Sequence, residues 1–170
     1  TLDGMRHIQN HAGVTVDEIA AIEIFGYGPT AAICDRMLVE NPRDARFSVQ
    51  YCLSALLHTG NVRLGAFLPE TMERADIRQF MEKITVTEDA EIAAAYPRKR
   101  MARLKVHLTG GRVIDHFQQT RKGDPDDPLT DAELFEKYDE LAGSVLDHEE
   151  RERLKRLLMD EDILPGSVAI

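Results

Sequence analysis

Three residues on one short stretch of the chain have side chains that could bind or protonate a small molecule: Arg46, Ser48 and Tyr51. A phenol such as Tyr51 can donate a hydrogen bond to a developing negative charge and, if its pKa is perturbed, a proton. The Arg46 guanidinium can bind a carboxylate through two parallel hydrogen bonds. Ser48 and Tyr51 are three positions apart, so on a helix they would share one face.

These side chains are predicted to lie on one helix that runs from Pro42 to the residue before Gly60. Asn41 is a suitable N-cap, Pro42 fits the first helical position, and Gly60 is a natural end. An apolar stripe at helical spacing is formed by Ala45, Val49, Leu53 and Leu56. Cys52 is expected in the core beside that stripe.

Tyr51 is expected to point away from the apolar stripe, on the same face as Ser48. Two interpretations of this second face remain open: the solvated back of a core helix, or the lining of a polar pocket. Arg46 is five residues from Tyr51, roughly 140° around the helix, so it could serve the same pocket only from the first turn.

Composition excludes several classes of function. The chain has 170 residues and a formal net charge of -9, with a pI of about 5.1. An acidic chain of this kind is poorly suited to general nucleic-acid binding. No apolar run reaches the roughly 20 residues of a membrane span, and no signal peptide is visible at the start. Cys34 and Cys52 lack C-x-x-C spacing, so free thiols and a cytoplasmic location are expected.

Two further clusters are weaker candidates for binding sites. His7 and His11 are one helical turn apart, a spacing that can hold a metal ion. No third ligand accompanies them, so we expect packing or surface roles and no metal site. The basic run from Pro97 to Arg100 is predicted to be a solvated loop.

The remaining patterns predict an α+β fold with an antiparallel or mixed sheet, packed helices, and further helices at the carboxyl end. The clearest signal is a β-hairpin around Gly110 and Gly111, where two alternating runs place one face in the core. Other predicted elements are helices over 2–12, 76–83 and 131–146 and from Asp147, and strands over 19–25 and from Ile84.

A resemblance to a known family extends this reading. The run from Ala45 to Tyr51 is followed by Gly123-Asp124-Pro125, by Pro128-Leu129-Thr130 and by Glu136-Lys137-Tyr138. In order and spacing these motifs resemble the MmgE/PrpD family over nearly the whole chain. That family includes 2-methylcitrate dehydratases, cis-aconitate decarboxylases and iminodisuccinate epimerases.

The resemblance implies that this chain is the carboxyl-terminal part of a two-domain enzyme. Residues 1–124 would form an α+β lid domain, and residues 125–170 would be helices that pack on a large all-helical domain. On these positions Tyr51 would be catalytic, and Ser48 and Arg46 would bind substrate. The main acid–base residues would lie outside this chain, so the chain alone is expected to be inactive.

The implied function is that of a cofactor-independent lyase acting on a small tricarboxylate, as a 2-methylcitrate dehydratase does in propionate catabolism. Alternatives are an epimerase, isomerase or decarboxylase of the same family, or a non-catalytic lid or interaction module. The expected partners are a small polycarboxylate and a second copy bound through the helical domain, with no nucleic acid and no membrane. No cofactor and no metal are expected.

Overall fold

The computed structural model describes residues 1–159, and the chain divides into two compact units. The first unit is Thr1–Asp126, and the second begins at Asp127. The assignment of residues 1–124 to a lid domain and of residues 125–170 to helices that pack on a further domain stays a prediction, because a contact boundary within this chain does not show what either unit covers.

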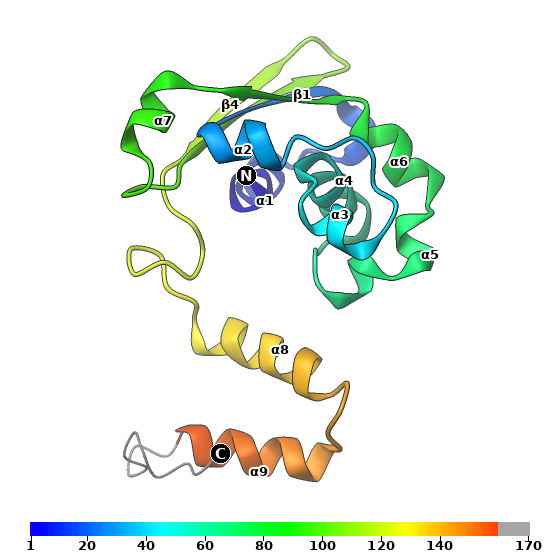
Figure 1. Cartoon of the computed structure of the whole chain (residues 1–170), viewed down its shortest axis with the longest axis vertical. Helices are drawn as coiled ribbons and strands as arrows, with labels where there is room; N and C mark the ends of the chain where they lie inside the picture. Colours follow the sequence, from blue (N-terminus) through cyan, green and yellow to red (C-terminus); the bar gives the residue numbers. More distant parts are fainter. Residues whose placement is uncertain (160–170) are drawn as a thin grey trace. The chain divides into compact units, whose positions relative to one another are not determined.

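A four-stranded mixed sheet is the framework of the first unit (Figure 1). Its strands are β1 (Ile19–Gly26), β2 (Ile84–Glu88), β3 (Ala102–Leu108) and β4 (Val113–Gln118), in the order β2-β1-β3-β4. β1 pairs in parallel with β2 and antiparallel with β3, and β3 pairs antiparallel with β4. The predicted α+β class with a mixed sheet is therefore confirmed, as is the hairpin.

The sheet is covered by helices on one face and carries charged side chains on the other. The alternation in β3 buries Leu104 and Val106 and leaves Arg103 exposed. On the charged face Glu23 accepts a hydrogen bond from His107 at 2.6 Å when that ring nitrogen carries its proton. His107 thus contacts the neighbouring strand through Glu23 on the charged face of the sheet.

The α-helices of the first unit include three that the sequence patterns do not predict: α2, α7 and α5, the last only four residues long. In chain order the helical elements are α1 (Leu2–Ala12), η1 (Val16–Glu18), α2 (Gly28–Ile33), α3 (Pro42–Arg46), α4 (Val49–Thr59), η2 (Leu64–Phe67), α5 (Pro69–Met72), α6 (Ala75–Met81) and α7 (Ala90–Ala95). Both α2 and α7 are six residues long, too short to show a helical period.

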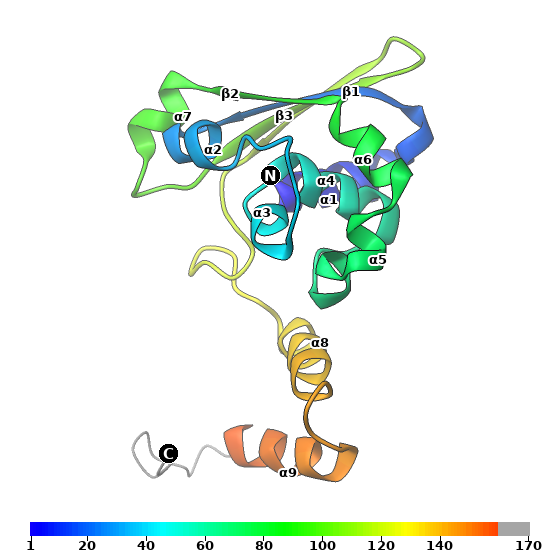
Figure 2. The same ribbon diagram turned by 45° about the vertical axis from the view of Figure 1, so that its right-hand side comes forward.

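Two apolar clusters hold this unit together. The larger cluster lies between the sheet, α1 and α4, and includes Met5, Ile8, Ile22, Leu53 and Leu104. The smaller cluster lies where α3 and α4 meet η2, α5 and α6, and includes Ala45, Tyr51, Ala55, Ile77 and Met81. Figure 2 shows α5 and α6 beside α4, as Figure 1 does. α4 thus belongs to both clusters.

The single helix predicted from Pro42 to the residue before Gly60 is wrong: the chain forms α3 and α4 with a break at Phe47 and Ser48. In a continuous helix the Val49 N–H would bond the carbonyl of Ala45, four residues earlier. Instead it donates to the carbonyl of Cys34 at 2.9 Å. Both predicted ends hold, since Asn41 caps α3 through two backbone N–H groups and Gly60 ends α4 with φ 81°.

The second unit contains two helices in the part of it that is described, α8 (Asp131–Ala142) and α9 (His148–Met159). Thr130 and Glu133 form a capping box at the start of α8. The two helices are joined by a hydrogen bond of 2.9 Å from the Tyr138 hydroxyl to the Arg151 carbonyl. Lys155 lies 4.4 Å above the ring of Phe135.

No helix within residues 1–159 combines the length and the apolar character that crossing a bilayer requires.

Candidate functional site

Ser48, predicted to bind substrate, is a fully buried N-cap of α4. Its hydroxyl oxygen accepts from the Tyr51 N–H at 3.0 Å, and the hydroxyl donates to the Arg36 carbonyl at 2.5 Å. Both functions of the hydroxyl are therefore used within the chain, one to begin the helix and one to hold the segment before α3. Neither a solvated face nor an open pocket surface is therefore found at Ser48 in this conformation, and its role in substrate binding stays a prediction.

Tyr51, predicted to be catalytic, lies in the smaller apolar cluster and has no exposed surface. Its hydroxyl donates to the carbonyl of Ala66 in η2, and its ring lies 6.3 Å from that of Phe67. Burial raises the pKa of the phenol. The break before α4 explains why the predicted orientation is wrong: Tyr51 belongs to a new helix, so it faces the same cluster as Ala45 and not the side opposite to it.

In this conformation the Tyr51 hydroxyl is not available to a ligand, because it is buried and donates its hydrogen bond to the Ala66 carbonyl of η2. A catalytic role for Tyr51 stays a prediction that would require η2 to move. Cys52 donates through its thiol to the Ala45 carbonyl at 3.3 Å, and burial raises its pKa to about 12. Its predicted place beside the core agrees with these contacts.

Arg46 is the one predicted site residue whose side chain is exposed. Its guanidinium carbon lies 5.3 Å from the centre of the Phe67 ring, a cation–π contact. The neighbouring Phe47 is 47% exposed. The structure therefore does not bring Arg46, Ser48 and Tyr51 together on one surface, and it leaves only Arg46 available to a ligand.

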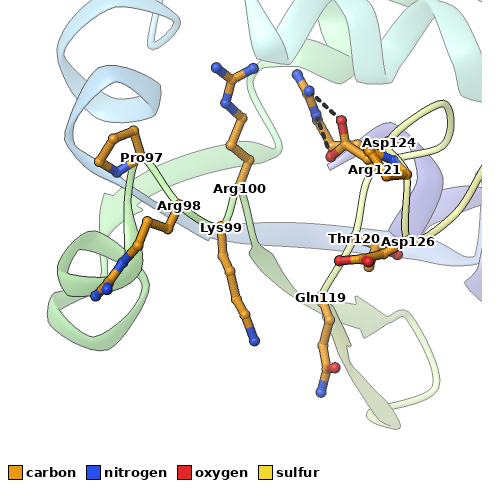
Figure 3. Close-up of a pocket in the computed structure, with 10 residues that line it drawn as sticks. Pro97, Arg98, Lys99, Arg100, Gln119, Thr120, Arg121, Asp124 and Asp126 are labelled. Carbon is orange, nitrogen blue, oxygen red and sulfur yellow. Dashed lines mark hydrogen bonds and ion pairs between the residues drawn. The ribbon is translucent and has the colours of Figure 1, made fainter.

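A second candidate is an open hollow of about 640 Å³ in the first unit (Figure 3). One wall is the basic run from Pro97 to Arg100, which immediately precedes β3. The other wall is formed by Gln119–Arg121 and Asp124–Asp126, which follow β4. Because Ala102 pairs with Gln118, the hairpin places these two segments at the same end of the sheet.

Both walls of the hollow are held by contacts with the rest of the unit. The ring of Tyr96, just before the basic run, stacks on Tyr27 with centroids 4.5 Å apart. On the other wall the Lys122 N–H donates to Asp3 of α1 at 3.1 Å. Gly123 takes φ 95°, which L side chains rarely adopt, and lets the Asp124 N–H turn back to the Arg121 carbonyl at 3.0 Å.

The hollow is cationic although the chain is acidic. Four cationic and two carboxylate side chains line it, a formal balance of +2. Arg121 binds Asp124 through two hydrogen bonds of 3.1 and 2.5 Å. This pairing lowers the pKa of Asp124 and raises that of Arg121. No carboxylate of the described chain lies within ion-pair distance of Arg98, Lys99 or Arg100.

The basic run is exposed, as the predicted solvated loop would be. The other wall of the hollow, formed by residues 119–121 and 124–126, is not part of that prediction. A signal for that wall is present in the sequence. A run directly before the first strand of a hairpin and a run directly after the second must lie at the open end of the hairpin. The predicted hairpin therefore already places Arg100 near Arg121.

Within residues 1–159 no cluster of three or more His, Cys, Asp or Glu side chains is arranged to hold a metal ion. His7 stacks face to face on His11 at 3.9 Å and on His116 of β4 at 4.3 Å between ring centroids. Parallel rings at this spacing do not direct their nitrogens to a common point. The histidine pair on α1 therefore packs against the hairpin.

A mixed sheet with helices on one face and a second helical unit define an α+β chain. The hollow in its first unit has a formal balance of +2 and therefore suits an anion better than a cation. The model of one protein family, described as the MmgE/PrpD C-terminal domain, matches residues 1–161. The chain belongs to this family, and the resemblance seen in its motifs is confirmed. A search of curated proteins found no match to the chain.

Proposed function

We propose that this chain is the lid part of a cofactor-independent lyase that acts on a small tricarboxylate, in the manner of a 2-methylcitrate dehydratase. The observation that carries the proposal is the match to the family's C-terminal domain from residue 1 to residue 161. The proposal adds to that match a reaction and a substrate class, which the family resemblance implies.

The reaction requires acid–base groups and groups that bind carboxylates. In a dehydration of this kind a base removes a proton from the carbon next to a carboxylate, and the hydroxyl of the adjacent carbon takes a proton and leaves as water. The acid and the base would come from the helical domain. The exposed guanidinium of Arg46 would bind a substrate carboxylate, which Arg does better than Lys because its planar fork matches the two oxygens.

The second unit supports the predicted packing on a helical domain. Large apolar side chains of this unit are exposed within this chain: Leu134 of α8 at 46%, Val145 between the two helices at 80%, and Leu158 of α9 at 67%. Apolar surface of this kind is stabilised by burial against another protein surface. We propose that the helical domain of the same enzyme supplies that surface.

The test is an assay of the full-length protein on 2-methylcitrate, cis-aconitate and iminodisuccinate. We expect turnover of 2-methylcitrate and none by the 170-residue chain alone. Arg46→Gln should raise KM about tenfold, since a hydrogen bond to a charged group contributes roughly 1.5–3 kcal/mol. Arg43→Gln is the matched control, because Arg43 is an exposed arginine of the same helix, and it should leave KM unchanged.

No turnover of any of the three substrates would remove the proposed reaction. Equal KM values for the two variants would remove Arg46 from the site while leaving the reaction in place.

A further inference from the structure

The cations of the basic run differ from other arginines of the first unit. Arg74 is paired with Asp76, and Arg103 with Asp115, each through two hydrogen bonds of 2.6–3.1 Å. Arg100 has no such partner among residues 1–159, and it follows two further cations directly. Like charges held this close repel one another, and a bound anion would relieve that repulsion.

Two arginines of the hollow, one from each wall, extend to the same side of it. In Figure 3 the side chains of Arg100 and Arg121 extend to the same side, and Lys99 and Gln119 extend to the opposite side. The Asp124 carboxylate bound to Arg121 also feels the charge of Arg100. The Asp124 carboxylate is thus an oxyanion on which both arginines act, through the two hydrogen bonds from Arg121 and the charge of Arg100.

We propose that the hollow binds a small polyanion through Arg100 and Arg121, with Arg98 and Lys99 adding to the positive potential. The shared chemistry of the ligand is two or more carboxylate or phosphate groups on a small molecule. The planar guanidinium of arginine binds either group through two parallel hydrogen bonds. A volume of about 640 Å³ accommodates a small organic anion, and the net charge of -9 disfavours a nucleic acid as the partner.

Asp124 acts as an internal competitor for this ligand. Its carboxylate occupies the fork of Arg121, so a bound anion must share or displace it. Asp126 at the edge of the hollow and Asp3, whose charge also acts on Arg121, further reduce the positive potential. Neutralising Asp124 should therefore strengthen binding, whereas neutralising Arg100 should weaken it.

The walls are formed before any ligand arrives. The Tyr27–Tyr96 stack fixes the start of the basic run, and the Lys122 contact with Asp3 fixes the opposite loop to α1. Little ordering of the backbone would accompany binding. The favourable electrostatic free energy of binding would therefore not be offset by a loss of loop entropy. This claim concerns equilibrium binding and does not depend on the reaction proposed above.

The experiment is a calorimetric titration of the chain at low ionic strength with citrate and, separately, with pyrophosphate. We expect one bound anion per chain, binding about tenfold weaker in Arg100→Gln, and tighter binding in Asp124→Asn. Arg112→Gln is the matched control, because it removes one exposed arginine of the same unit at the far end of the hairpin; its affinity should equal that of the wild type.

Binding of citrate alone identifies a carboxylate ligand, and binding of pyrophosphate alone identifies a phosphate ligand; both support the site. The proposal is overturned if neither anion binds, or if Arg100→Gln binds as tightly as Arg112→Gln. Because neither probe needs to react, a failure here is separate from a failure of the lyase assay.

Discussion

The polar side chains at the start of α4 and those of the basic run in the hollow differ in burial and in hydrogen bonding. In α4 the hydroxyls of Ser48 and Tyr51 are fully buried, and each is satisfied by a backbone carbonyl of the same chain. In the hollow, Arg98, Lys99 and Arg100 are exposed and have no ion-pair partner within residues 1–159. In the first region the polar groups hold helices together, and in the second the cationic groups are available to a ligand.

The difference shows that the type of a residue does not fix its role. A tyrosine and a serine three positions apart suggest a catalytic surface, yet here they join α4 to η2 and to the segment before α3. A run of arginine and lysine suggests a solvated loop, yet here it forms one wall of a hollow. Burial and the partner atoms decide between the two outcomes.

The largest effect that would test this comparison is that of Tyr51→Phe. Removing the hydroxyl leaves the Ala66 carbonyl buried without its donor, so we expect a loss of about 2 kcal/mol in the free energy of unfolding. Urea denaturation of the chain measures it. Tyr96→Phe is the control, because Tyr96 is 38% exposed, and its stability should equal that of the wild type.

The kinetics of the same variant in the full-length protein separate a structural tyrosine from a catalytic one. We expect kcat close to that of the wild type. A large fall in kcat with unchanged stability would restore the catalytic role and show that η2 moves during the reaction.

Replacing each of two buried serines at α4 by alanine should change the free energy of unfolding differently. Ser48→Ala removes the N-cap of α4 and should cost about 1 kcal/mol. The Ser54 hydroxyl is fully buried and has no hydrogen-bond partner within the described chain, so Ser54→Ala should be neutral or slightly stabilising.

Chemical denaturation of both variants in parallel measures the two effects. Equal losses of stability would mean that the hydroxyls are equivalent, and the distinction between a satisfied and an unsatisfied buried group would fail.

The smallest effect concerns the pH dependence of the hollow. The hydrogen bonds from Arg121 lower the pKa of Asp124 in the folded chain. The pair therefore stabilises the folded chain above the unfolded pKa of about 3.9, and this contribution is lost as the pH falls through the lower, folded pKa.

Carboxyl NMR titration of the chain follows Asp124 directly, and Arg121→Gln should return its pKa toward the ordinary value. Asp115, whose pKa is lowered by Arg103, is an internal control that should not respond. An unchanged pKa of Asp124 in that variant would show that Arg121 is not its partner in solution.

Much of the fold follows from local patterns. The alternation before Gly110 and Gly111 yields β3, whose buried face carries Leu104 and Val106, and the turn returns the chain as β4 beside it. The predicted cap at Asn41 is correct because its side-chain oxygen accepts hydrogen bonds from N–H groups of the next turn, a purely local contact. The two six-residue helices α2 and α7 are not predicted, because six residues are too few to show a helical period.

The candidate site was less accessible to sequence reasoning because its geometry depends on long-range contacts. The sequence by itself determined the hairpin, the helix caps and, through its motifs, the family. Only the tertiary structure decided that the Val49 N–H bonds Cys34, which breaks the helix and turns Tyr51 inward. A backbone hydrogen bond across 15 residues of sequence leaves no local periodic signal, so the orientation of every side chain beyond the break depends on the folded chain.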